Sequence, residues 1–249
     1  MSSHAPTFAL VAAAGQGTRL GASLPKAFVP LDGLSLVERS VRTLLGSGVI
    51  DEVRVLVSPE WESYARDLFA EAGLLEQVAL VHGGGERADS VFAGLRSLPD
   101  TADAPGARVL IHDAARALTP ASLIRRVVAA LDAGERAVIP VLPVSDTIKV
   151  VTEEDRVAST PSRASLRAVQ TPQGFDLATL CEANEAYFAE PPERRGQLIT
   201  DDASLMEWRG VPVACVPGDP LAMKVTTPLD YEVAQLLLDR RRTEKEGQQ

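Results

Sequence analysis

The chain has 249 residues, of which 45% are hydrophobic and 24% charged, a composition typical of a folded globular protein and not of a disordered or fibrous one. Its 34 acidic residues outnumber its 25 basic ones, and the formal net charge of −9 argues against nonspecific binding to nucleic acid or to an anionic membrane. Two cysteines are too few for a disulfide framework or a structural zinc site, which favours a reducing compartment. Because no basic signal region precedes the first apolar run and no run approaches the roughly 18 residues of a membrane span, we expect a cytoplasmic protein.

Short apolar runs alternate with amphipathic stretches through the first 143 residues, which predicts strand-helix-strand units and an α/β fold with a mostly parallel, twisted sheet flanked by helices. The predicted strands are 7–13, 52–57, 78–82, 108–112 and 137–142. Capping residues mark the helix starts between them: Ser35 and Glu38 predict a capping box, and Ser58 and Thr119 each precede a first-turn proline. We expect one domain over residues 1–249, since the chain contains no low-complexity linker.

Residues 144–161 break this alternation of strands and helices. Two alternating segments, TIKVV and RVAST, flank an acidic turn at 153–155 and predict a β-hairpin with little apolar surface. An isolated hairpin is marginally stable in water, so it should pack on the main body or on a second subunit. Beyond it the sequence predicts a strand near 166–170, helices near 177–188 and 201–209, a strand at 212–216, a helix from Pro228 and a disordered tail over 241–249.

A glycine-rich segment follows the first predicted strand, with Gly15, Gly17 and Gly21 bringing backbone N–H groups within reach of phosphate oxygens. It is not a dinucleotide fingerprint, because Leu20 occupies the place of the third glycine, and no Gly-Lys-Ser/Thr triplet makes it a P-loop. It does carry two cations, Arg19 and Lys26, which could neutralise a polyphosphate and the charge that develops in phosphoryl transfer. The simpler alternative is a tight turn with two surface cations.

Two further loops follow predicted strands. Residues 83–85 are three consecutive glycines, which could open a surface for a flat base at the edge where α/β sheets collect ligands. Asp113 ends the fourth strand and could hold Mg²⁺ together with ligand phosphates and water, although a lone aspartate there is more often a cap or turn residue. His82 and His112 have no nucleophile in sequence context, so we interpret both as structural.

Seven segments occur in a fixed order along the chain: AAAGQGTRLG, PKAF, GGGERADSV, HDAAR, TPQGF, ITDDAS and MKVTTPLD. Together they resemble the 2-C-methyl-D-erythritol 4-phosphate cytidylyltransferases of non-mevalonate isoprenoid biosynthesis over nearly the whole chain. The resemblance implies a nucleotidyltransferase-type, Rossmann-like fold whose projecting β-arm falls at residues 144–161. It also implies a homodimer with interlocked arms, a Mg²⁺ cofactor, and CTP and a polyol phosphate as substrates.

The same resemblance implies roles for individual residues. Arg19 and Lys26 would be the catalytic cations that stabilise the transition state. The nucleotide would be bound by Ala13, Ala14, Gly15, Gln16, Gly17, Gly84, Gly85, Ser90 and Ala114. The acceptor would be bound by Asp113, Arg116, Thr147, Arg163, Thr171, Thr200 and Lys224, and Asp113 would also be the metal ligand. The chain departs from the family at Ala117, where proline is usual, at 221–223, and at Gly85, where an acidic residue can occur.

The chemistry of such a reaction agrees with the side chains present. A phosphate monoester with a second pKa of roughly 6 is already largely dianionic at neutral pH, so it can attack without a general base. This accounts for the lack of a recognisable base-nucleophile pair, and leaves positioning and charge neutralisation to the protein. The alternatives are a ribitol 5-phosphate cytidylyltransferase and a non-catalytic nucleotide-binding module on the same fold.

Overall fold

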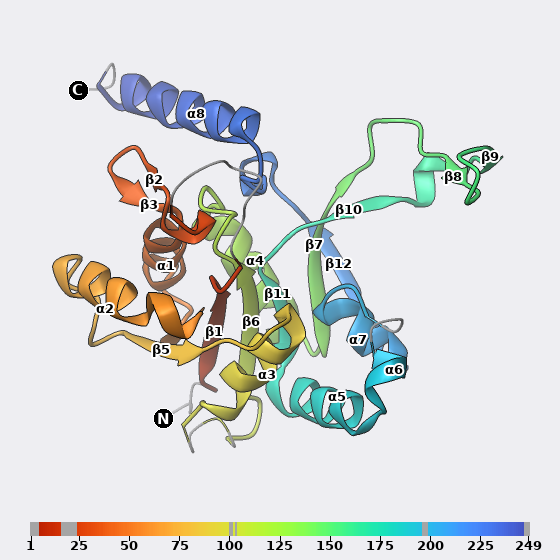
Figure 1. Cartoon of the computed structure of the whole chain (residues 1–249), viewed down its shortest axis with the longest axis horizontal. Coiled ribbons are helices and arrows are strands. Elements are labelled where there is room, and N and C mark those ends of the chain that lie inside the picture. Colours follow the sequence, from red (N-terminus) through yellow and green to blue (C-terminus); the bar gives the residue numbers. More distant parts are fainter. Residues whose placement is uncertain (1–4, 16–23, 100–101, 103, 196–198, 247–249) are drawn as a thin grey trace.

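The computed structural model describes residues 5–15, 24–99, 102, 104–195 and 199–246 (Figure 1). One eight-stranded sheet has the order β10-β7-β11-β6-β1-β4-β5, with β12 also paired to β7. Its strands are β1 (Thr7–Ala12), β4 (Glu52–Val57), β5 (Val78–His82), β6 (Arg108–Asp113), β7 (Ala137–Pro143), β10 (Arg167–Val169), β11 (Gln173–Asp176) and β12 (Ala214–Pro217). The core strands β6, β1, β4 and β5 are parallel, as is the β7–β12 pair, whereas β10 and β11 run antiparallel to their neighbours. The predicted mostly parallel α/β core is therefore confirmed.

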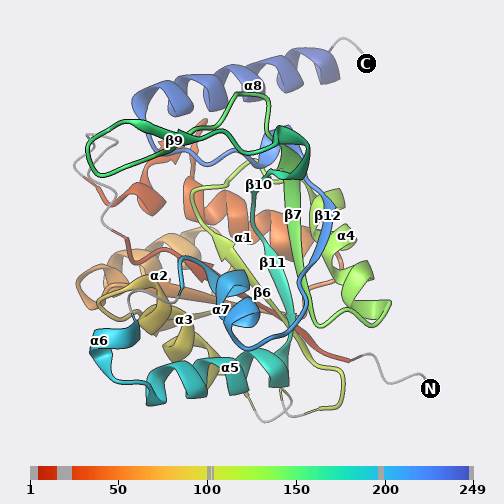
Figure 2. The same ribbon diagram turned by 90° about the vertical axis from the view of Figure 1, so that its right-hand side faces the viewer.

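Helices cover both faces of this sheet (Figures 1 and 2). The side chains of β1 alternate: Ala9 and Val11 pack with α1 (Leu36–Gly46), α2 (Glu62–Glu71) and α4 (Ala121–Asp132), which share one core. Phe8 and Leu10 point the other way, into a core shared by α3 (Arg87–Arg96), α5 (Leu177–Ala189) and α7 (Asp202–Trp208). The remaining elements are β2 (Pro30–Leu31), β3 (Leu34–Ser35), α6 (Pro192–Arg195), α8 (Pro228–Glu246) and the 3-10 helices Lys26–Phe28, Pro59–Trp61, Arg163–Ser165 and Pro220–Ala222.

Of the three predicted helix caps, only the first is made. Ser35 Oγ accepts the Glu38 N–H at 3.2 Å and caps α1. The Ser58 hydroxyl instead donates to the Ala14 carbonyl at 3.1 Å, and the Thr119 hydroxyl donates to the Arg116 carbonyl at 2.8 Å. Both hydroxyls serve the loops at the sheet edge, so these two cap predictions were wrong.

The C-terminal tail also differs from the prediction. Instead of disorder from residue 241, α8 continues to Glu246, while residues 247–249 lie outside the described part of the chain. Arginine, lysine and glutamate are good helix formers, and an Arg242–Asp239 ion pair at 2.7 Å supports this last part of the helix. Sequence patterns also missed β11, whose four residues are too few to show a period.

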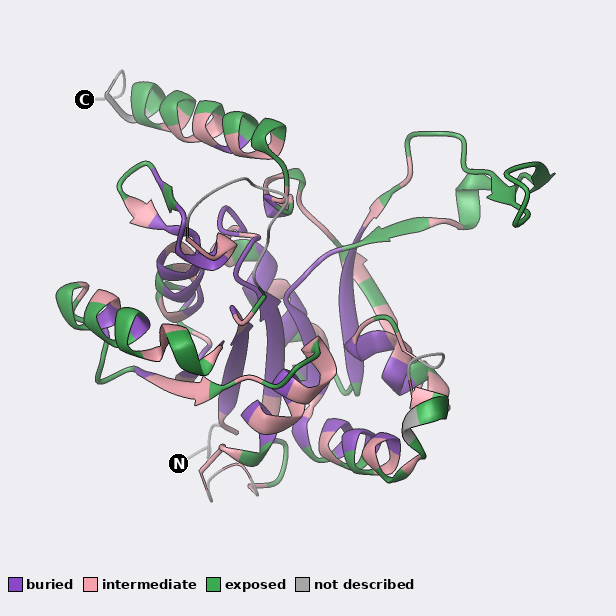
Figure 3. Cartoon of the chain, viewed as in Figure 1, coloured by how far each residue is buried: buried purple, intermediate pink, exposed green. Residues whose placement is uncertain are grey.

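The arm, residues 144–161, forms the predicted hairpin from β8 (Val150–Val151) and β9 (Val157–Ser159), which pair with each other and not with the main sheet. It projects from the ends of β7 and β10 (Figure 1), and its residues are exposed along nearly its whole length (Figure 3). Within the described residues, no helix has the length and apolar character needed to cross a membrane.

Candidate active site

A cavity of about 210 Å³ opens where the core strands end. The strand register explains its position: Ala12 lies opposite both Leu56 and Asp113, and His82 lies opposite Val57, so the loops after β1, β5 and β6 leave the sheet at one edge. The lining residues are Ala12, Ala13, Ala14, Gly15, Lys26, Ala27, Gly84, Gly85, Glu86, Arg87, Ser90, Asp113, Ala114, Ala115 and Lys224. The structure thus brings most of the predicted nucleotide-binding residues together with Lys26 and Lys224.

The second glycine loop, residues 83–86, is held by the start of α3. Ser90 Oγ accepts the Gly84 N–H at 3.0 Å and donates to the Glu86 carbonyl at 3.1 Å. These two bonds fix the backbone of the loop to α3. A Cβ on Gly84 would lie 2.2 Å from the Cβ of Asp89, so a side chain cannot be accommodated there without a shift of the helix. Gly85 has no such restriction, because its nearest neighbour would be 3.9 Å away.

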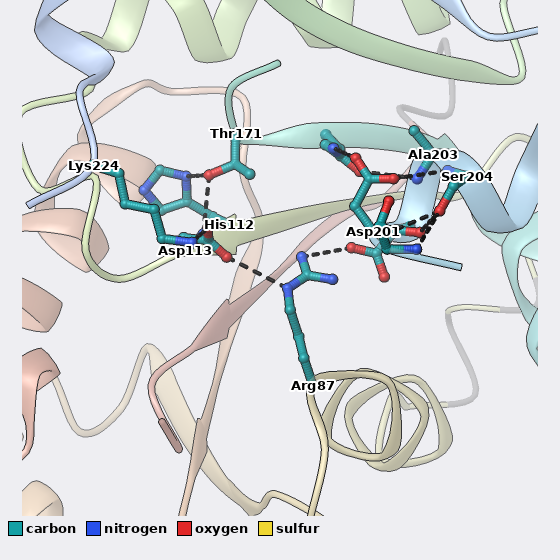
Figure 4. Close-up of polar contacts among 11 residues, drawn as sticks. Arg87, His112, Asp113, Thr171, Asp201, Ala203, Ser204 and Lys224 are labelled. Atoms are coloured by element: carbon teal, nitrogen blue, oxygen red, sulfur yellow. Dashed lines mark hydrogen bonds and ion pairs between the residues drawn. The ribbon is translucent and has the colours of Figure 1, made fainter. Parts of the chain in front are cut away.

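Asp113 lies between two cations at the end of β6 (Figure 4). Its Oδ2 is 2.7 Å from Lys224 Nζ, and its Oδ1 is 3.5 Å from Arg87 Nε. Burial by itself raises the pKa of this carboxyl, but Arg87 and Lys224 outweigh that effect and hold the pKa well below its usual range. Asp113 is therefore a carboxylate at all physiological pH values.

Arg87 reaches a second carboxylate, that of Asp202 at the start of α7, with 2.7 Å between Nη2 and Oδ2. Burial lowers the pKa of Arg87, but the charges of Asp202 and Asp113 more than offset this and raise it. The same helix start is fixed by Gln173, which donates to Asp201 Oδ2 at 2.7 Å and accepts the Ala203 N–H at 3.0 Å. Neither Arg87 nor Asp202 was predicted from the sequence as a site residue, although a second aspartate at the start of a helix that needs only one cap was a signal.

Behind Asp113, Thr171 Oγ1 accepts the Asp113 N–H at 3.0 Å and lies 3.2 Å from His112 Nδ1. Burial lowers the pKa of His112 from 6.5 to about 4, so the ring is neutral at pH 7. The structural interpretation of His112 agrees with this environment. Thr171 lies beneath the cavity floor and not among its lining residues.

Other predicted acceptor residues do not line the cavity. Arg116 donates to the carbonyl oxygens of Ala222 at 2.6 Å and Val169 at 3.2 Å, and so ties the segment before Lys224 to β10. Thr200 is exposed beside the start of α7. Thr147 lies on the arm, and Arg163, at the arm's base, donates to the Ser145 carbonyl at 2.7 Å.

Three predicted residues of the first glycine-rich segment, Gln16, Gly17 and Arg19, lie outside the described residues. Lys26, the second predicted catalytic cation, begins a 3-10 helix and lines the cavity.

The described residues contain no group of three or more His, Cys, Asp or Glu side chains that could hold a metal ion. Asp113 is the buried carboxylate of the cavity, and its Oδ1 is the less tightly paired oxygen. Mg²⁺ commonly takes one or two carboxylates and completes its shell with substrate phosphates and water. The donor set therefore fits Mg²⁺ that arrives with a nucleotide, and does not fit an all-protein metal site.

Comparison with known proteins identifies the family. The family profile of 2-C-methyl-D-erythritol 4-phosphate cytidylyltransferase matches residues 7–240. A protein of that name from Corynebacterium glutamicum is 57% identical to this chain over 244 residues, which cover 96% of this chain and 94% of the relative. The corresponding protein from Nocardia farcinica is 52% identical over 233 residues, which cover 94% of each chain. The Thermus thermophilus enzyme of that name has a solved structure that is 34% identical, with a TM-score of 0.72, and covers 93% of this chain and 98% of its own. A 4-diphosphocytidyl-2C-methyl-D-erythritol synthase from Anaerococcus prevotii, 26% identical, has a TM-score of 0.79 over 95% of this chain and 100% of its own. The chain belongs to the 2-C-methyl-D-erythritol 4-phosphate cytidylyltransferase family.

Proposed function

We propose that this protein joins CTP to 2-C-methyl-D-erythritol 4-phosphate, giving 4-diphosphocytidyl-2-C-methyl-D-erythritol and pyrophosphate in non-mevalonate isoprenoid biosynthesis. The observation that carries the proposal is the cavity in which Lys26, Asp113 and Lys224 meet Gly15, at the start of the first glycine-rich segment, and the second glycine loop. Those side chains supply charge and the loops supply backbone donors, which together meet the needs of a reaction between two phosphates.

In this reaction an oxygen of the acceptor phosphate attacks the α-phosphorus of CTP, a new P–O bond forms, and the bond to the β-phosphate breaks to release pyrophosphate. No proton has to be removed from the attacking dianion. Lys26 neutralises charge on the nucleotide phosphates, and Lys224, across the cavity at Asp113, holds the acceptor phosphate. The residues of this chain therefore act by alignment and by charge.

Asp113 would hold Mg²⁺, which when bound would supply positive charge to the phosphates during the release of pyrophosphate. We expect Asp113→Asn to raise the Mg²⁺ concentration needed for half-maximal activity or to abolish turnover, because the variant lacks a hard anionic ligand. A magnesium titration of initial rates measures this. Mg²⁺ dependence identical to that of the unmodified protein would remove Asp113 from the metal site.

The working unit in this proposal is a homodimer formed through the arm. Support comes from the apolar side chains Ile148, Val150, Val151 and Val157, which are 41–61% exposed among the described residues. Thr147 and Arg163 do not line the chain's own cavity, so a role in acceptor binding requires that they reach the cavity of a partner. The cytoplasmic location stays a prediction from cysteine usage.

The direct test is pyrophosphate release by the purified protein with CTP, Mg²⁺ and each candidate acceptor in turn. We expect turnover with 2-C-methyl-D-erythritol 4-phosphate, and mass spectrometry of the product should give its cytidine diphosphate conjugate. Preference for ribitol 5-phosphate would assign the protein to the alternative reaction. CTP binding without turnover on either acceptor would instead support a non-catalytic module.

A further inference from the structure

Arg87 is the first residue of α3 and directly follows the second glycine loop. Its guanidinium lies between carboxylates from two other parts of the chain, with Nη2 2.7 Å from Asp202 Oδ2 and Nε 3.5 Å from Asp113 Oδ1 (Figure 4). One side chain thereby connects the loop on the nucleotide side of the cavity to β6 and α7 on the acceptor side.

The Asp113 carboxylate is shared between two cations, one on each oxygen. Lys224 takes Oδ2, and Arg87 faces Oδ1. Because Arg87 neutralises part of the Asp113 charge, Lys224 retains more of its own positive charge toward the cavity. Without Arg87, the Asp113 carboxylate would pair more fully with Lys224, and the lysine would be less available to an incoming phosphate.

The contact with Asp202 has a different consequence. Asp202 is only 5% exposed, and burial raises its pKa against the opposing effect of Arg87. A buried carboxylate without a cation is strongly destabilising, so simple removal of Arg87 would also disturb the start of α7. A test of Arg87 therefore has to separate this structural contact from the contact with Asp113.

We propose that Arg87 is a positioning residue for the acceptor phosphate: by holding one oxygen of Asp113, it leaves Lys224 oriented by the other oxygen and open to the phosphate. The inference rests on the proposed function, because it takes the acceptor to be a phosphate monoester. Arginine suits this position because its planar guanidinium presents several donors in a fixed geometry and can serve two carboxylates at once, which a lysine ammonium does less well.

The test uses two variants, of which the double variant keeps the net charge of the unmodified site. Asp202→Asn alone leaves Arg87 on Asp113, whereas the double variant Arg87→Met/Asp202→Asn removes one charge of each sign, so the net charge of the site and the compensation of buried carboxylates are retained. We expect the double variant to raise the KM for the acceptor at least about tenfold, while the KM for CTP stays within about threefold. The single variant should change neither KM by more than about threefold, and thermal unfolding measures the stability of both.

A second readout needs no turnover. Acetylation of Lys224 by acetic anhydride, followed by mass spectrometry, should be at least about threefold slower in the double variant than in Asp202→Asn, because the lysine is then paired more fully with Asp113. If the unmodified protein releases no pyrophosphate with either acceptor, the proposed function fails and this labelling still decides the role of Arg87. Three results would overturn the proposed role of Arg87. They are an unchanged KM for the acceptor in the double variant, an equal rise in its KM for CTP, and equal labelling of Lys224 in the two variants. If the double variant does not fold, Arg87→Lys replaces it with the same expected direction for both readouts.

Discussion

The two carboxylates at and beside the cavity, Asp113 and Asp202, are buried and meet cations from distant parts of the chain, whereas the charged side chains on the arm are exposed. Asp113 and Asp202 each pair with a cation more than a hundred positions away or on another element, and both are at most 9% exposed. On the arm, Val151 and Val157 are 55% and 61% exposed, and Lys149 donates to Thr160 Oγ1 across the hairpin at 2.8 Å.

The difference in exposure between the cavity and the arm distinguishes the part of the site that a single chain forms from the part that it leaves open. Within the described residues, residues 13–15, the second glycine loop, Lys26 and Asp113 meet at the cavity within a single chain. The arm presents Thr147 to solvent, and its valines, although paired across the hairpin, are about half exposed or more. Under the proposed function, the exposed apolar surface of the arm has an explanation, which is that the arm of a second copy completes the acceptor side of the cavity.

The strongest test of the cavity is Lys26→Ala. We expect kcat to fall about 100- to 1000-fold, because the lysine meets charge that grows toward the transition state, while acceptor binding changes much less. Steady-state kinetics with pyrophosphate detection measure both. Arg66→Ala removes an exposed cation paired with Glu62 and should leave kcat unchanged. Near-normal turnover of the Lys26 variant would favour the simpler alternative, in which the first glycine-rich segment is only a tight turn.

The matching test of the arm replaces residues 144–161 with a short Gly/Ser loop. We expect a monomer in solution and a loss of about 10- to 100-fold in kcat/KM for the acceptor, the scale of one lost charge-assisted contact, with CTP affinity retained. Light scattering gives the mass and calorimetry the CTP affinity. Glu153→Gln/Glu154→Gln changes only the charge of the turn and should remain dimeric. A loop-replaced protein that is dimeric and fully active would contradict the proposed dimer.

A smaller effect is expected in the second glycine loop, where two neighbouring glycines provide their own control. The Cβ of Gly84→Ala would overlap Asp89, which we expect to cost about 1–3 kcal/mol in CTP binding, in stability or in both. Gly85→Ala has open space and should leave both properties within about 0.5 kcal/mol of the unmodified protein. The KM for CTP and the unfolding temperature measure the pair. Equal values of the KM for CTP and of the unfolding temperature for the two variants would show that the loop adjusts to the added Cβ at Gly84 without a measurable cost.

A further test uses pH to separate the two regions. The pKa of His112 is lowered from 6.5 to about 4, so between these values the unfolded chain takes up a proton that the folded protein does not. Stability is therefore fully present above pH 6.5 and falls by about 3 kcal/mol as the pH drops to 4. Urea unfolding of the protein and of His112→Asn should show this difference, while Glu153→Gln on the exposed arm should follow the unmodified protein. Parallel pH profiles for the protein and His112→Asn would mean that the ring is not buried in neutral form.

Local pattern was enough to predict the core strands and the arm, because each is signalled within a few residues by alternation or by a β-branched run. The roles of Asp113 and Lys224 followed from motif resemblance, and the structure places them 2.7 Å apart. Pattern failed for Ser58 and Thr119, whose hydroxyls bond to loop carbonyls that only the folded sheet brings near. It also failed for Arg87, because its partner Asp202 is set by the packing of α7 and by no spacing in the sequence.

The pairing of Lys224 with Asp113 across 111 residues has a consequence for biosynthesis. During translation β1, β4, β5 and β6 are synthesised before the rest of the main sheet, so these strands can form their parallel core early. Asp113 is then already at its strand end, but its lysine arrives only after nearly all the remaining chain has been translated. Substrates that need both groups cannot bind a nascent chain, so they can stabilise the finished protein but cannot assist its early folding.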